Sequence, residues 1–125
     1  MEILKGKVIK GENIGEKQGY PTANLSRRVL NNKNITNGVY IAATIYNNRK
    51  YKTILIIGVP GIKKQKKGKV EILFLNFKKN IYGKNILAQP LTKIRPLKFY
   101  SDHNKLIARI EKDIAITKNY FKADK

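Results

Sequence analysis

The sequence predicts a mainly β fold: a small β-barrel that is closed or flanked by one C-terminal helix. Two observations lead to this prediction. Several short segments carry alternating or densely apolar residues, and glycine- or asparagine-rich turns separate them. The C-terminal segment instead repeats its apolar residues at helical spacing. Because 125 residues suit one hydrophobic core, we expect a single domain over residues 1–125.

Five segments have the alternation or the β-branched content of strands: residues 3–9, 38–47, 51–58, 70–77 and 84–95. The clearest alternation is in the second of them, and the asparagine-rich residues 47–50 after it predict a hairpin turn. Residues 26–37 are polar and are expected as a loop. Pro90 cannot donate a backbone hydrogen bond, so it indicates an edge or a bulge in the last strand.

The helix is expected to begin after Ser101 or Asp102, either of which can cap its first turn. Its apolar residues recur every three to four positions: Leu106, Ile110, Ile114 and Phe121. We interpret this stripe as core packing rather than as a binding face.

The composition excludes several kinds of site and compartment. There is no cysteine and one histidine, His103, which excludes disulfides, a thiol nucleophile and any site that needs two histidines. The longest apolar run, residues 54–57, is far too short to cross a bilayer, and no signal peptide opens the chain. We therefore expect a cytoplasmic protein without a membrane partner.

The formal net charge of +19 is open to three interpretations. A basic surface suits nucleic acid, yet only five of the 27 basic residues are arginines, and the abundance of Lys, Ile and Asn is typical of an AT-rich coding sequence. We favour a solvated lysine-rich surface and expect no nucleic-acid partner. The third interpretation is electrostatic attraction of anionic substrates, above all by the lysines of residues 63–69.

Residues 11–24 contain the candidate chemistry. Gly11, Gly15 and Gly19 allow backbone N–H groups to turn toward one point, as in loops that hold phosphate. Thr22 and Asn24 alternate after Pro21, so a hydroxyl and an amide oxygen share one face and could bind magnesium. The alternative from spacing alone is a turn in which the asparagine caps a nearby backbone group.

The segment G-Y-P-T-A-N, residues 19–24, resembles the signature of the riboflavin kinase (flavokinase) family. The resemblance covers about residues 5–121. Further motifs similar to those of the family follow in order: Asn37-Gly38-Val39-Tyr40, Gly58-x-Pro60, Val70-Glu71, Tyr82-Gly83, Arg95-Pro96 with Phe99, and Leu106, Ile110 and Asp113.

This resemblance implies a six-stranded antiparallel Greek-key barrel with a C-terminal helix, and a kinase that converts riboflavin and ATP to FMN and ADP. It implies that Thr22 and Asn24 bind Mg²⁺ and the ATP phosphates and that Glu71 is the general base. Arg95 and the start of the helix would face the isoalloxazine ring. The loops of residues 11–19 and 58–69 would close over the ligands. The remaining binding residues it implies are Gly11, Gly15, Lys17, Gly19, Pro21, Gly58 and Phe99.

Two of these roles have structural alternatives. Glu71 could be an outward strand residue paired with a lysine, and Arg95 could form a surface ion pair. The chain also departs from the family pattern, which has Arg, Leu, Asn, His and Asp where this sequence has Glu16, Gln18, Ile56 or Ile57, Leu73 and Asn76.

We expect a monomer that makes FMN and no FAD, because the adenylyltransferase domain of typical bacterial members has no counterpart in these residues. The main alternative is a non-catalytic flavin-binding module derived from the same barrel, with RNA as a further ligand. A nucleic-acid-binding barrel, in which Tyr40, Tyr46 and Tyr51 stack on bases, is the third hypothesis.

Overall fold

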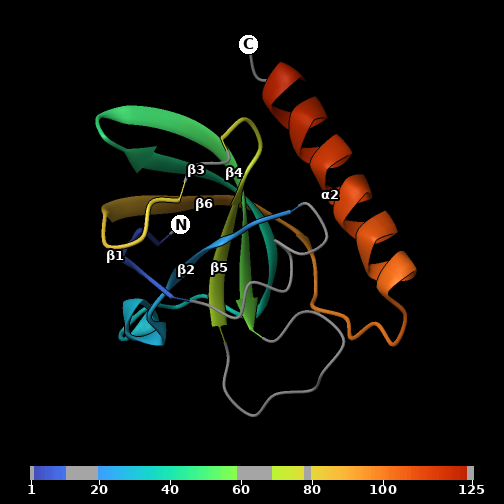
Figure 1. Ribbon diagram of the computed structural model, residues 1–125, viewed down its shortest axis with the longest axis horizontal. Coiled ribbons are helices and arrows are strands. Elements are labelled where there is room, and N and C mark those ends of the chain that lie inside the picture. Colours follow the sequence, from blue (N-terminus) through green and yellow to red (C-terminus); the bar gives the residue numbers. More distant parts are fainter. Residues whose placement is uncertain (1, 11–19, 59–68, 78–79, 124–125) are drawn as a thin grey trace.

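Six antiparallel strands form a closed barrel, and one long helix lies along its outside (Figure 1). The computed structural model describes residues 2–10, 20–58, 69–77 and 80–123. The elements in chain order are β1 (Leu4–Ile9), β2 (Ala23–Leu25), the 3-10 helix η1 (Arg27–Leu30), β3 (Gly38–Tyr46), β4 (Arg49–Gly58), β5 (Lys69–Phe74), β6 (Asn85–Arg95) and α2 (His103–Ala123). Around the barrel the strands follow the order β1, β2, β5, β4, β3, β6, and β6 pairs with β1. The predicted fold class is confirmed.

The β3–β4 hairpin is tighter than the sequence predicts. Its turn consists of Asn47 and Asn48 alone, with φ values of 52° and 63°, so β4 begins already at Arg49. Two successive residues with positive φ match the twist of the flanking strands, and asparagine tolerates this conformation well. Of the edge or bulge predicted for Pro90, the structure has a bulge beside it, because the β3–β6 register shifts between Ile41, opposite Thr92, and Ala42, opposite Pro90.

Two short elements escaped the sequence prediction. β2 has only three residues, too few to show an alternating pattern, and η1 lies inside the segment expected as a loop. The hydroxyl of Ser26 accepts a hydrogen bond of 3.2 Å from the Arg28 backbone N–H and caps η1. β5 ends at Phe74, three residues earlier than predicted.

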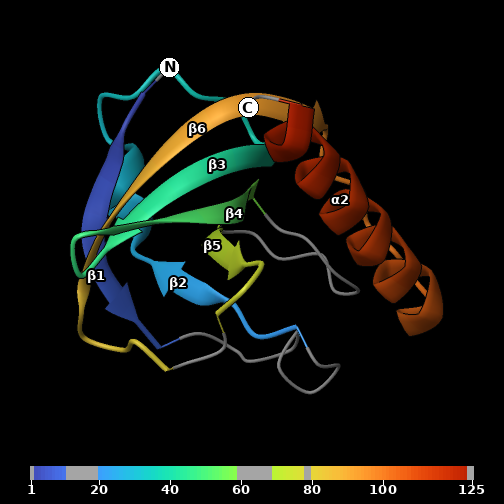
Figure 2. The ribbon, with the colours of Figure 1, turned by 90° about the horizontal axis from the view of Figure 1, so that it is seen from above.

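Alternation along the strands divides the apolar residues into two layers. One set fills the barrel interior and includes Leu4, Val8, Leu25, Leu55, Val70, Ile72 and Ile86. The other set lies on the outer face of the barrel beneath α2, where Val39, Ile54 and Leu73 pack with Ile110 and Ile114. Figures 1 and 2 show α2 along one side of the barrel from two directions.

The helix α2 starts as predicted, and the structure selects one of the two candidate caps. The Asp102 carboxylate accepts a 2.8 Å hydrogen bond from the Asn104 N–H. Leu106, Ile110 and Ile114 face the barrel as the stripe predicts. Phe121 is half-buried against Tyr120, with ring centroids 5.4 Å apart. No helix of the described residues is long and apolar enough to span a membrane.

An ion pair fastens α2 to the end of β6. Arg95 donates from Nη2 to Asp113 Oδ2 at 2.8 Å, and its Nε lies 3.1 and 3.2 Å from the two carboxylate oxygens. Arg109 Nε donates to the same carboxylate at 3.1 Å. Asp113 is only 3% exposed, so both guanidinium groups compensate a charge that burial would otherwise destabilise.

Replacing Asp113 with alanine should lower the free energy of unfolding by about 3 kcal/mol, because two partly buried guanidinium groups lose their carboxylate. Chemical denaturation measures this change. Asn119→Ala, at an exposed position of the same helix, is the control and should stay within about 0.5 kcal/mol of the wild type. Equal stability of the two variants would contradict the proposed anchoring of α2.

Candidate active site

The barrel brings Thr22, Asn24 and Glu71 together on its outer face. Asn24 of β2 lies directly opposite Glu71 of β5 in the antiparallel register. Their neighbours Ala23 and Ile72 point into the core, so alternation turns the amide and the carboxylate outward. The Thr22 hydroxyl lies 3.5 Å from Glu71 Oε1. Three oxygen-bearing side chains, from β5, from β2 and from the residue just before β2, therefore share one site.

The side chain of Asn24 supports both interpretations of the Thr22–Asn24 spacing. Its Nδ2 donates to the Thr22 carbonyl at 3.4 Å, which is the local backbone cap expected from spacing alone. Asn24 is 7% exposed, so this bond fixes the orientation of a nearly buried amide. The bond occupies the amide nitrogen and leaves the amide oxygen as the end of the group that can bind a cation.

The donor set fits a magnesium ion that shares its coordination with phosphates. Hydroxyl, amide and carboxylate oxygens are hard ligands, and protein-bound Mg²⁺ usually takes only one or two protein oxygens together with substrate phosphates and water. Within the described residues, no group of three or more His, Cys, Asp or Glu side chains could hold a metal by itself. The Thr22–Asn24–Glu71 cluster thus suits a substrate-completed site better than a closed metal site.

Gly58 and Arg95 have structural explanations in addition to their predicted binding roles. Gly58 has a φ of 120°, and a Cβ there would collide with the Leu97 side chain. The positive φ therefore favours glycine at this position, and a larger residue would also displace the Leu97 side chain. Arg95 forms an ion pair with Asp113, as the alternative predicted, but this pair is largely buried and does not lie on the surface. Phe99 is 48% exposed and presents its ring to solvent.

Several predicted site residues lie outside the part of the chain that the structure describes: Gly11, Gly15, Lys17 and Gly19, together with Glu16, Gln18 and the lysines of residues 63–68. The phosphate-binding loop and the attraction of ATP by these lysines remain predictions. Of the departures that can be located, Ile56 is the cross-strand partner of Glu71. Leu73 is buried beneath α2, and Asn76 is exposed.

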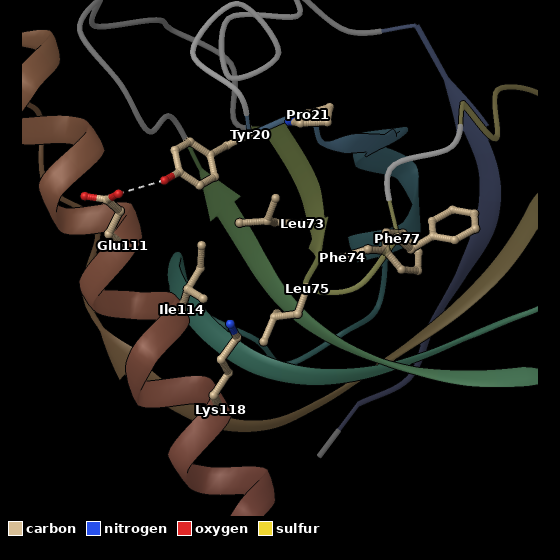
Figure 3. Close-up of a pocket in the computed structure, with 9 residues that line it drawn as sticks. All are labelled: Tyr20, Pro21, Leu73, Phe74, Leu75, Phe77, Glu111, Ile114 and Lys118. Carbon is tan, nitrogen blue, oxygen red and sulfur yellow. Dashed lines mark hydrogen bonds between the residues drawn. The ribbon is translucent and has the colours of Figure 1, made fainter.

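A pocket of about 300 Å³ lies between β5 and α2, close to the Thr22–Asn24–Glu71 cluster. The Tyr20 hydroxyl donates to Glu111 Oε2 at 3.0 Å across its mouth. Figure 3 shows the two side chains reaching toward each other, with Leu73 and Ile114 between the strand and the helix. Pro21, which precedes Thr22, also lines the pocket. The sequence analysis missed Glu111, because nothing in the local pattern links it to a residue 91 positions away.

The three tyrosines that the third hypothesis requires to stack on nucleic-acid bases do not form an exposed platform, so the structure does not support that hypothesis. Tyr40 is 3% exposed and donates to the Thr36 carbonyl at 2.6 Å. Tyr46 and Tyr51 are half-buried in an aromatic cluster with Phe77, at centroid distances of 5.7 and 5.2 Å. All three rings serve packing of the barrel rather than a surface.

Comparison with known proteins agrees with this fold. The flavokinase family, described as "Riboflavin kinase", matches residues 2–121. The bifunctional riboflavin kinase/FMN adenylyltransferase of Buchnera aphidicola subsp. Schizaphis graminum is 41% identical over 121 residues, covering 94% of this chain and 38% of that protein. The RNA-binding riboflavin kinase RibR of Bacillus subtilis is 32% identical over 122 residues, covering 97% of this chain and 52% of that protein. The chain thus spans about half or less of these relatives.

Solved structures support the same architecture. A structure titled as a macrolide-efflux protein from Streptococcus pneumoniae matches with a TM-score of 0.80 at 24% identity, covering 94% of this chain and 38% of that one. Riboflavin kinase from Trypanosoma brucei matches with a TM-score of 0.64 at 22% identity, covering 96% of this chain and 79% of that one. At these identities the two structures show the fold alone. The closed six-stranded barrel with one C-terminal helix places the chain in the same fold class as the solved riboflavin kinase. With the family match over residues 2–121, the chain belongs to the flavokinase (riboflavin kinase) family.

The pKa of Tyr20 is raised above its usual value of 10.0, first by the hydrogen bond to Glu111, then by desolvation and by the charge of that carboxylate. Because the folded-state pKa exceeds the unfolded one, the stabilisation is fully present below pH 10 and is lost as the pH rises through the folded-state pKa. A pH titration of tyrosinate absorbance, taken as the difference between the wild type and Tyr20→Phe, measures the pKa of Tyr20 alone. Glu111→Ala should lower the pKa of Tyr20 toward 10.0, because it removes the acceptor, whereas a Tyr82→Phe control should not. An unchanged titration of Tyr20 in Glu111→Ala would argue against the bond.

Proposed function

We propose that the protein is an ATP-dependent riboflavin kinase, which transfers the γ-phosphoryl group of ATP to the 5′-hydroxyl of riboflavin and releases FMN and ADP. The observation that carries this proposal is the convergence of Asn24 on β2, Glu71 on β5 and Thr22 just before β2. Membership of the flavokinase family supports the choice of substrates. We further propose that the enzyme is monomeric and cytoplasmic.

Glu71 acts as the general base in this proposal. Its carboxylate accepts the proton of the 5′-hydroxyl while the oxygen forms a bond to the γ-phosphorus and the bond to the ADP oxygen breaks. A rigid strand suits this role, because β5 is paired on both sides, by β2 and by β4, at the position of Glu71. The base therefore needs little reorganisation before the reaction.

Thr22 and Asn24 are the residues that would hold the metal and the phosphates in this proposal. Their side-chain oxygens suit Mg²⁺ that shares its coordination with phosphates, and the ion would supply positive charge beside the transferred group. The near-burial of Asn24 and its bond to the Thr22 carbonyl keep these ligands in place before the nucleotide arrives.

The register of the sheet suggests where the flavin lies. Glu71, Ile56, Val39 and Arg95 are successive Cα partners across β5, β4, β3 and β6. Strand spacing places the Cα atoms of Glu71 and Arg95 on the order of 14 Å apart along this row, and α2 covers Ile56 and Val39 between them. We propose that the ribityl chain begins at Glu71 and that the isoalloxazine ring lies toward Arg95 and the start of α2, near the exposed side chain of Phe99.

Glu71→Gln should reduce kcat for FMN formation by about 100-fold or more, because a neutral amide of the same shape cannot take the proton. Separation of FMN from riboflavin by chromatography measures the rate. The KM for ATP should change far less, since the phosphates are held by other residues. Glu2→Gln is the matched control, because Glu2 bonds the Asn34 N–H on another part of the barrel.

A wild-type protein that forms no FMN from riboflavin, ATP and Mg²⁺ would falsify the proposed activity. Full activity in Glu71→Gln would leave the reaction intact but remove this residue as its base.

A second candidate function is RNA binding, either beside the kinase activity or, in a non-catalytic flavin-binding module, without it. The net charge of +19 and the similarity to a relative named as an RNA-binding riboflavin kinase favour it. The expected result is RNA affinity that falls steeply with salt, because lysines displace counterions from phosphates. Gel-shift titration at several salt concentrations measures this, and absence of binding at low salt excludes the function. Tight flavin binding without turnover would identify the non-catalytic module.

A further inference from the structure

Thr22 lies just ahead of the segment that the sheet holds. The register of β2 with β5 begins at Ala23, and the register of β2 with β1 covers only Asn24 and Leu25. The pairing of β2 with its neighbours therefore fixes Asn24 directly, but it does not include Thr22, whose hydroxyl lies next to Glu71. The Asn24 side chain holds the Thr22 carbonyl at 3.4 Å, and a further restraint on Thr22 comes from the residues before it.

Tyr20 is attached at two points, both outside the sheet. Its ring packs in the apolar layer beneath α2, where Leu73 and Ile114 also lie. Its hydroxyl donates to Glu111 Oε2 at 3.0 Å (Figure 3). The ring contact restrains the side chain loosely, because apolar packing has no preferred direction, whereas the hydrogen bond fixes the reach and direction of the ring.

The acceptor of this bond is itself well placed. Glu111 is two residues before Asp113 on α2, and the buried Asp113 carboxylate ties the helix to Arg95 of β6. Between Tyr20 and Thr22 stands Pro21, whose ring fixes φ and removes one backbone rotation. Few free torsions therefore separate the anchored phenol from the Thr22 hydroxyl.

We propose that Glu111, acting through Tyr20, is a positioning residue that holds Thr22 in place to bind the divalent cation and nucleotide phosphates; the identity of these ligands rests on the proposed kinase function. Glu111 touches neither substrate nor metal. Its effect is to restrict residues 20–22 to the conformation in which Thr22 faces Glu71.

The expected effect is on binding more than on the chemical step. When the tether is removed, residues 20–22 populate further conformations, and only a fraction of molecules present Thr22 correctly. The loss of one hydrogen bond to a carboxylate at an exposed position corresponds to about a threefold to tenfold weakening. Glu71 keeps its own position on β5, so kcat should stay within about twofold.

The test uses four variants of the full chain. Tyr20→Phe removes only the donor, Glu111→Ala removes the acceptor, and Glu111→Gln keeps an acceptor oxygen without the charge. The double variant Tyr20→Phe with Glu111→Ala tests whether the two residues act as one unit. Lys112→Ala, an exposed neighbour of Glu111 on α2, is the control.

Three measurements are made on each variant. The first is the affinity for Mn²⁺ with ADP, measured from the electron paramagnetic resonance of the ion. The second is the KM for ATP together with kcat, and the third is amide hydrogen exchange over residues 20–25. Tyr20→Phe and Glu111→Ala should weaken affinity and raise KM about threefold to tenfold and should speed exchange. The double variant should be no worse than the single ones, Glu111→Gln should recover most of the affinity, and the control should match the wild type.

Wild-type affinity and exchange in Tyr20→Phe would overturn the proposal, and so would a Glu111→Gln variant as weak as Glu111→Ala. A wild type that makes no FMN would contradict the kinase function but not the positioning role, since Mn²⁺–ADP affinity and exchange still decide the latter. A wild type that does not bind Mn²⁺ with ADP would overturn the role toward the metal, whatever the exchange shows.

Discussion

The placement of α2 depends on one buried carboxylate. Asp113 accepts hydrogen bonds from Arg95, the last residue of β6, and from Arg109 on its own helix. Apolar contact beneath α2 supplies attraction but little direction, because hydrophobic packing tolerates sliding and rotation. The bond to Arg95 is directional and joins the helix to a fixed point of the barrel. It therefore sets which helix residues face β5, and with them the pocket that contains Tyr20 and Glu111.

The second constraint is the register between β2 and β5. Side chains alternate along a strand, so the same pairing that buries Ala23 and Ile72 turns Asn24 and Glu71 outward. A slip of one residue would bury the carboxylate and expose the core, which makes any other register strongly unfavourable. Burial of the barrel interior thus holds Asn24 and Glu71, the proposed metal ligand and base, opposite each other. The stability of the barrel and the proposed function both depend on the β2–β5 pairing.

These two constraints explain how much could be predicted from the sequence. The strands with clear alternation, the helical stripe and the shared face of Thr22 and Asn24 follow local periodicity, and the structure has them. The family resemblance extended this prediction to Glu71, which the register then brought next to Thr22. The Arg95–Asp113 ion pair and the Tyr20–Glu111 bond join residues 18 and 91 positions apart. Such partners depend on tertiary packing, which no local spacing encodes.

The departures from the family pattern acquire a physical meaning in this setting. Leu73 and Ile56 stand where the family pattern has a histidine and, by one alignment, an asparagine, and both belong to the apolar layer beneath α2. Each apolar side chain there enlarges the surface on which α2 docks and removes a polar group that would otherwise need a partner. Neither change touches the Glu71 carboxylate or the Asn24 amide. In this chain the layer beside the site therefore favours docking of α2 but does not orient it. The orientation of the helix and of residues 20–22 then depends on the hydrogen bonds of Asp113 and Glu111.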